Sequence, residues 1–336
     1  MALVLAACLG GLAAGCASSG SSAQTGVPVL QRVANLEKTT LNVSALANGD
    51  SAGFFVALHE GLFAQEGLQV NYTPAFSDNV IAEQMEGKLD ITGIDYVSYI
   101  EAELHHTADL RIFAEGARLR PGSQVIMTMP GSRIQSLPEL KGHVLGVTAG
   151  SNLNVGYLLV AALLAQNGIS MKVTSAYSPN SVVLPTSPNF PFPASKPLIR
   201  GQVSAAIMSE PYATELAEQY GATIISDTDS GATNDLPITG YAVSKAWARA
   251  NPNTLKAFDI ALEAGQDIAD SNRSAVEEAL EALPAGAGKV SNLVASTMAL
   301  DYFPLGVSRI DLQRILDFMQ EFGFLKQNFN IGQMLS

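Results

Sequence analysis

The spacing of apolar and polar residues switches repeatedly between the period of a strand and that of a helix. Residues 41–46 alternate apolar and polar side chains, which is typical of a strand. Asp50 and Ser51 interrupt this pattern and are suited to cap a helix. Apolar residues then recur every three or four positions until Gly67 ends the predicted helix. Open α/β ligand sites are built from this strand–loop–helix unit, and the helix's free amides can hold a ligand's negative group.

The rest of the chain continues this alternation. Strands alternating with helices predict an α/β fold with parallel sheet order. Six prolines between residues 178 and 197 indicate a loop rather than a helix or strand. Further strands are expected at 68–76, 90–95, 110–115, 124–129, 144–147, 173–176, 203–208, 221–226 and 239–244, and the last helices at 274–283, 292–302 and 308–322.

The α/β pattern lapses twice, near residues 116–121 and 227–237, where glycine, proline and small polar residues gather. We interpret each lapse as a crossing between two lobes. Lobe 1 then comprises residues 39–117 and 238–336, and lobe 2 comprises residues 118–237. A ligand cleft is expected where the carboxyl ends of the strands meet between the lobes.

Five segments resemble one known family. Phe55-x-Ala57-x-x-x-Gly61-x-Phe63-x-x-x-Gly67-Leu68-x-Val70 resembles the opening signature of the substrate-binding proteins of nitrate, sulfonate and thiamine-precursor importers. Helical packing requires apolar periodicity, but not two glycines and a phenylalanine at these offsets. Later motifs of the same family are resembled by residues 87–95, 137–151, 201–212 and 244–252. Ser204 departs from the pattern, because an aspartate is usual at its position.

The resemblance covers about residues 40 to 325. It implies a two-lobed, type 2 periplasmic-binding-protein-like fold. It also implies a solute-binding role, with a small-molecule solute and an ABC permease subunit in the membrane as partners.

Composition narrows the possible partners. The 336 residues are 47% hydrophobic and 15% charged, which suits a large buried core. The net charge of −12 argues against binding of nucleic acid, which requires a basic face.

The N-terminus is typical of an export signal. An apolar, uncharged run precedes Cys16, and Ala13-Ala14-Gly15-Cys16 resembles a lipoprotein signal box. We therefore expect a lipoprotein signal peptide over residues 1–16, lipidation of Cys16 and a flexible tether over residues 17–38. The absence of Lys and Arg near the start departs from this pattern, and a secretory signal cut nearby is the alternative. Cys8 also has a suitable local sequence, but it lies close to Met1 and lacks a tether behind it.

The sequence offers little for catalysis or metal binding. Cys8 and Cys16 are the only cysteines, so the expected folded body has no disulfide and no thiol nucleophile. None of the four histidines has a partner at metal-binding spacing, and neither a Walker loop nor a nucleophile elbow is present. We therefore predict no cofactor, no metal and no catalytic residue.

Loops from both lobes supply groups that we predict to bind the ligand. Backbone amides and hydroxyls suit an oxoanion, whereas carboxylates favour an amine or an amidine-like ring. The sequence leaves open whether the carboxylates face the cleft, since Asp78 is equally suited to cap its helix and Glu210 to begin one. The predicted ligand-binding residues are Asp50, Ser51, Gly53, Phe54, Ser77, Asp78, Asn79, Asp95, Tyr96, Thr148, Ser151, Asn152, Glu210 and Tyr212.

These features together favour an exported, lipid-anchored solute-binding component of an ABC importer, for which a monomer suffices. One rival is an enzyme on the same scaffold that resembles pyrimidine synthases. Such an enzyme should require a cofactor-binding lysine and a cysteine-rich motif. A second rival is a ligand-sensing module, which would call for a transmembrane segment and a signalling domain, and we see neither in the sequence.

Overall fold

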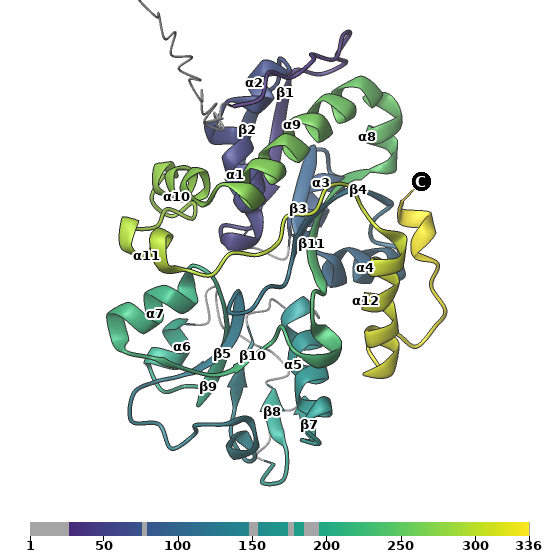
Figure 1. Cartoon of the computed structure of the whole chain (residues 1–336). Helices are drawn as coiled ribbons and strands as arrows, with labels where there is room; N and C mark the ends of the chain where they lie inside the picture. Colours follow the sequence, from purple (N-terminus) through teal and green to yellow (C-terminus); the bar gives the residue numbers. More distant parts are fainter. Residues whose placement is uncertain (1–26, 76–78, 148–153, 174–177, 185–194, 336) are drawn as a thin grey trace, which may run out of the picture.

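The structure, a computed structural model, describes residues 27–75, 79–147, 154–173, 178–184 and 195–335. Its strands form two main sheets, one in each lobe (Figure 1). The predicted signal peptide, the lipidation site Cys16 and residues 17–26 of the predicted tether lie outside the described residues.

The sheet of lobe 1 has the strand order β2-β1-β3-β11-β4. Strand β1 pairs in parallel with β2 and β3, whereas β11 runs antiparallel to both β3 and β4. The strands are β1 (Thr40–Ala45), β2 (Gln69–Pro74), β3 (Ile91–Asp95), β4 (Leu110–Arg118) and β11 (Pro237–Ser244).

The sheet of lobe 2 has the order β10-β5-β9-β6, and a separate parallel pair joins β7 to β8. Strand β5 is antiparallel to β10 and β9, while β6 and β9 are parallel. The strands are β5 (Gln124–Thr128), β6 (Leu145–Gly146), β7 (Met171–Val173), β8 (Val182–Leu184), β9 (Ala205–Ser209) and β10 (Thr223–Asp227).

The expectation of parallel order was therefore wrong for two strands, β11 and β5. Strands β4 and β5 lie on either side of the first crossing, and β10 and β11 on either side of the second. In each sheet a strand at a crossing, β11 or β5, is antiparallel to both of its neighbours, and β10 pairs antiparallel with β5. Both sheets are consequently mixed, because the chain enters and leaves each lobe through these strands.

Helices cover the sheets of both lobes (Figure 1). The C-terminal helix α12 contacts α4 of lobe 1 and α5 of lobe 2, so it spans the junction between them. The longer helices are α1 (Ala52–His59), α4 (Tyr96–Leu104), α5 (Val155–Gln166), α7 (Tyr212–Tyr220), α9 (Pro252–Ser271), α10 (Arg273–Ala282) and α12 (Arg309–Glu321). The short ones are α2 (Leu62–Gln65), α3 (Val80–Met85), α6 (Ser195–Ile199), α8 (Lys245–Ala250) and α11 (Asn292–Thr297), with 3-10 turns at η1 (Gly49–Ser51), η2 (Leu137–Leu140), η3 (Gly231–Thr233) and η4 (Ile331–Met334).

Three expected elements differ from those observed. The first helix is divided into η1, α1 and α2, and Gly61 lies at the break with a φ of 69°. The proline-rich segment holds strand β8, because its Val182–Leu184 stretch is apolar and pairs with β7, and it leads into α6. Helix α11 ends at Thr297 rather than near Tyr302, since Met298 adopts an extended conformation with ψ of 150°.

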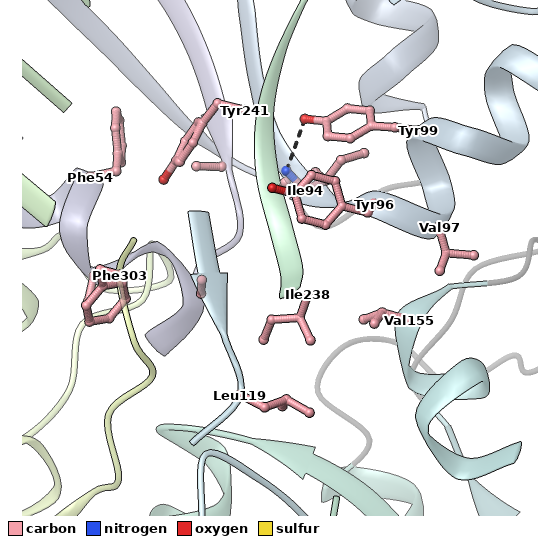
Figure 2. Packing of buried hydrophobic residues seen from close by; sticks show 14 of the residues in the cluster. Phe54, Ile94, Tyr96, Val97, Tyr99, Leu119, Val155, Ile238, Tyr241 and Phe303 are labelled. Atoms are coloured by element: carbon pink, nitrogen blue, oxygen red, sulfur yellow. Dashed lines mark hydrogen bonds between the residues drawn. The ribbon is translucent and has the colours of Figure 1, made fainter. Parts of the chain in front are cut away.

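The core of lobe 1 forms around α1 and α9, which pack on each other. Phe54 is fully buried, and its ring centroid lies 6.2 Å from that of Tyr241 (Figure 2). The ring centroids of Phe54 and Phe63 lie 5.6 Å apart. Phe63 in turn stacks on Phe258 of α9 at 4.7 Å. This cluster fixes the position of η1 and the N-terminus of α1, which face lobe 2.

Candidate functional site between the lobes

The loop after β1 forms direct hydrogen bonds to the loop after β9 in lobe 2. The Gly49 amide donates to the Glu210 carbonyl oxygen at 2.8 Å. The Tyr212 hydroxyl donates to the Ala47 carbonyl oxygen, also at 2.8 Å. The Asn48 side-chain amide donates to the Ser209 hydroxyl at 3.3 Å. The structure therefore shows the two lobes in direct contact at the ends of their strands.

Asp95 forms a second connection between the lobes. It is the N-cap of α4, where its carboxylate accepts from the Ser98 amide at 3.0 Å and the Ser98 hydroxyl at 2.7 Å. It also accepts from the Val155 amide at the start of α5, at 3.1 Å. Burial raises the pKa of Asp95, although these hydrogen bonds oppose the shift. One carboxylate thus holds the starts of two helices that belong to different lobes.

Glu210 lies in the same junction and is engaged by its surroundings. Its carboxylate accepts from the Thr214 amide at 3.1 Å, the Thr214 hydroxyl at 2.8 Å and the Ala299 amide at 3.3 Å. Burial raises its pKa, and these hydrogen bonds lower it. The Thr214 contacts fit the structural alternative considered for this residue, the start of a helix.

Asp50 and Asp301 form a buried carboxyl pair beside these contacts. Asp50 is 4% exposed and Asp301 is 6% exposed. Burial raises the pKa of Asp50 to about 6, a hydrogen bond from Asn48 opposes the shift, and the negative charge of Asp95 adds to it. Burial and the charge of Asp50 raise the pKa of Asp301 well above its ordinary value. The pair therefore retains a proton on Asp301, which hydrogen-bonds to Asp50.

Three predicted site residues lie inside lobe 1 instead of between the lobes. Phe54 and Tyr96 are fully buried, and Figure 2 shows both within the packed core. Gly53 faces α9, because a side-chain carbon placed there would lie 2.6 Å from the Gln266 side chain. These residues position the loop ends, and direct contact with a ligand stays a prediction for them.

Of the other predicted site residues, two are described by the structure and five are not. Ser51 is buried and its hydroxyl interacts with the phenol of Tyr241, so it lies beside Asp50 at the base of α1. Asn79 is the N-cap of α3 and is exposed, without a side-chain hydrogen bond at the cap. Ser77, Asp78, Thr148, Ser151 and Asn152 lie outside the described residues.

The structure adds residues that sequence reasoning missed. Asp301 was expected near the end of a helix, but it lies in an extended segment that runs beside the first crossing. There the Tyr302 amide and carbonyl bond to Arg118 of β4, at 3.1 and 2.9 Å. Ser123, 1% exposed, forms a hydrogen bond with Asp301. No local motif marks these residues, because a contact between distant segments brings them together.

Metal-binding clusters and membrane-spanning helices were sought among the described residues. Among them, no group of three His, Cys, Asp or Glu side chains is arranged to hold a metal ion. No helix in the described part of the chain is long and apolar enough to cross a membrane.

Two mixed α/β lobes, with loop ends meeting between them, define a type 2 periplasmic-binding-protein-like fold, as the sequence predicted. The chain belongs to the NMT1/THI5-like family, whose model matches residues 48–274. This match confirms the family resemblance seen in the sequence motifs. A comparison with curated proteins found no match.

Solved structures of the same fold cover most of the chain. The alkanesulfonate-binding protein SsuA from Xanthomonas axonopodis pv. citri, bound to MOPS, is 16% identical with a TM-score of 0.70, covering 89% of this chain and 99% of its own. The periplasmic nitrate-binding protein NrtA from Synechocystis PCC 6803 is 16% identical with a TM-score of 0.72, covering 89% and 86%. A ligand-binding component of an ABC-type import system from Staphylococcus aureus, with zinc bound, is 12% identical with a TM-score of 0.71, covering 89% and 97%.

Proposed function

We propose that this protein is an extracytoplasmic solute-binding protein of an ABC importer. It captures a small polar or heteroaromatic solute between its lobes and delivers it to a membrane permease. The observation that carries this proposal is the set of hydrogen bonds between the lobes, from Ala47 and Gly49 to Glu210 and Tyr212. Because these contacts join loop ends on opposite sides of the junction, closing and opening of the lobes would hide and expose the site.

The function is binding without covalent chemistry. The family membership supports this choice, as do three similar structures, each of which is a ligand-binding protein or component. No specific observation on the described residues favours the pyrimidine-synthase-like enzyme or the sensing module.

The proposed organisation follows the two sheets. Lobe 1 comprises residues 39–117 and 238–336, and lobe 2 comprises residues 118–237. The strands of each sheet fall within these ranges to within one residue. We place the protein as a monomer on the extracytoplasmic face of the membrane, anchored by lipid on Cys16 through the tether at residues 17–38.

Thermal unfolding of the purified chain against a ligand panel tests the function. The panel holds alkanesulfonates, taurine, nitrate, bicarbonate, aminopyrimidines, thiamine, riboflavin, polyamines and aromatic acids. A ligand at roughly 100 times its dissociation constant adds about 2.7 kcal/mol to stability. For a chain of this size, the unfolding midpoint should rise by about 4 °C or more.

A stabilising ligand should also compact the protein in small-angle X-ray scattering, because it favours the closed lobes. Failure of every class in the panel to shift the midpoint would contradict the proposal.

A further inference from the structure

Three buried oxygen atoms at the lobe junction have no hydrogen-bond donor among the described residues. They are Oδ1 of Asn48, Oδ1 of Asp50 and Oδ1 of Asp301. These side chains are 3%, 4% and 6% exposed, so bulk water does not readily satisfy them. A buried acceptor without a donor is energetically unfavourable, and more so when it is charged. Three such atoms in neighbouring side chains, without a donor among the described residues, are suited to accept hydrogen bonds from a bound solute.

The three side chains form a connected group. A hydrogen bond links the Asn48 side chain to Asp50, and another links Asp50 to Asp301. The Asn48 side-chain amide also donates a hydrogen bond to the Ser209 hydroxyl in lobe 2. The group therefore lies at the contact between the lobes, where a captured solute is expected.

The other acidic residues at the junction differ from this pair. Asp95 and Glu210 each accept three hydrogen bonds from the protein. Both carboxylates therefore hold loops and helix starts around the site through hydrogen bonds. Asp50 and Asp301, by contrast, each have a buried carboxyl oxygen without a hydrogen-bond partner among the described residues.

Positive charge from the protein does not neutralise the junction. Within the described ranges, no Lys or Arg forms a salt bridge with Asp50, Asp95, Glu210 or Asp301. The nearest basic side chains along the first crossing are engaged elsewhere, since Arg118 binds Glu115 and Asp311 and Arg120 lies over the Tyr302 ring. An anion at this point would meet carboxylates and acceptor oxygens.

We propose that the solute carries a protonated amine or amidinium group, which donates hydrogen bonds to Asp50, Asp301 and Asn48 at the lobe junction. This inference rests on the proposed solute-binding function and names the solute's chemical class. An ammonium supplies three N–H donors and a planar amidinium supplies four, and each carries a positive charge, so either can serve the three acceptors. The site therefore favours a charge opposite to that of nitrate or an alkanesulfonate, the anions bound by the similar proteins NrtA and SsuA.

Calorimetry with matched probes tests the class. The cationic probes are benzamidine, propylamine and putrescine, and the matched anions are benzenesulfonate and propanesulfonate, each titrated into the full-length chain. We expect binding by at least one cationic probe and none by the anions. The Asp50→Asn variant should weaken that binding about tenfold or more, because a charged hydrogen bond contributes about 1.5–3 kcal/mol.

Asp259→Asn is the matched control. Asp259 is a half-buried carboxylate on α9 that also has an unpartnered oxygen, and it lies outside the junction. This variant should bind the cationic probe with unchanged affinity. Equal affinity of Asp50→Asn and the unmodified chain would overturn the inference.

The pH dependence of the unmodified chain gives a second test that needs no variant. Cation affinity should rise as the pH rises through about 6, where Asp50 becomes ionised. Four other titratable groups interact electrostatically with Asp50, namely Tyr212, Tyr241, Asp95 and Asp301. The pKa of each is raised, so the two tyrosines stay neutral in this range. A flat or falling profile would count against the inference.

The outcomes separate the two proposals. Binding of the anions alone, or of a neutral solute alone, would overturn the amine class and leave the solute-binding function standing. Absence of binding by any probe here and any compound in the thermal panel would contradict both.

Discussion

Arg118 holds together the crossing between the lobes. Its guanidinium donates to the Glu115 carboxylate at 2.6 Å and to Asp311 of α12, also at 2.6 Å. Glu115 is 1% exposed, and burial raises its pKa to about 7 despite this partner. A side chain on β4 thereby ties the first crossing to the C-terminal helix.

We expect Arg118→Met to destabilise the protein by about 3–5 kcal/mol, because removing one partner leaves a buried carboxylate unpaired. Urea unfolding at neutral pH measures the change. Arg120→Met is the control on the same crossing. Its side chain is half-exposed, with Asp270 4.0 Å away and the Tyr302 ring below it, so its loss should cost only about 1 kcal/mol. Equal costs for the two variants would contradict this account of Arg118.

The residues of the candidate site were predictable where a local signal exists. Asp50 and Asp95 each stand between a strand pattern and a helix pattern, which marks a loop at the strand end. Asp301 has no such signal, because it reaches the site through the path of a long-range segment. Pairing of Tyr302 with Arg118 fixes that path, and neither residue shows this in the sequence.

At the scale of elements, helices α1 and α9 approach closely through two glycines. A carbon added at Gly265 would lie 2.5 Å from the Gly53 carbonyl oxygen and 2.5 Å from the Ala57 methyl group. One of these neighbours is backbone, so it cannot move aside without shifting the helix. The close approach holds the start of α1 at the lobe junction.

Gly265→Ala should therefore lower stability. Overpacking costs about 1–3 kcal/mol. The gain in helix propensity returns roughly 1 kcal/mol. We expect a net loss of up to about 2 kcal/mol in urea unfolding. Lys256→Ala, on the exposed face of the same helix, should change stability by less than about 0.5 kcal/mol. A Gly265→Ala variant more stable than the parent would show that the helices separate freely.

Most elements followed from hydrophobic periodicity, and the exceptions have local causes. Gly61 divides the first helix because a glycine with positive φ allows the chain to turn there. Strand β8 was not predicted, because its three apolar residues are too few to show the alternation of a strand and they lie in a proline-rich segment. The mixed direction of the sheets depends on how the crossings thread between lobes, and periodicity carries no information on strand direction.

At the scale of the whole molecule, burial raises the pKa of several carboxyl groups among the described residues. The chain carries a net charge of −12. Burial raises the pKa of Asp50 to about 6, and of Asp259 and Glu115 to about 7, from ordinary values of 3.8, 3.8 and 4.5. The nearby charge of Glu263 adds to the shift of Asp259, while Arg111 opposes it. These groups lie in different parts of the fold, so their effects on stability should add.

The raised pKa values predict how stability depends on pH. Between the unfolded and folded pKa of each group, the folded protein binds more protons than the unfolded chain. The free energy of unfolding should therefore fall as the pH rises from about 4 to about 7, and the decline should level off above that range. Self-repulsion of the acidic chain acts in the same direction. Urea unfolding midpoints at several pH values in this range measure the decline.

Asp259→Asn should flatten part of that decline, because it removes one buried group that must ionise. Asp267→Asn removes the same charge from the exposed face of α9, so it should leave the slope nearly unchanged. Stability that rises steadily from about pH 4 to about pH 7 would mean that carboxylates with lowered pKa values dominate, as in ordinary acid denaturation. An amine or amidinium solute at the lobe junction should reduce the decline further, because its charge offsets the cost of ionising Asp50.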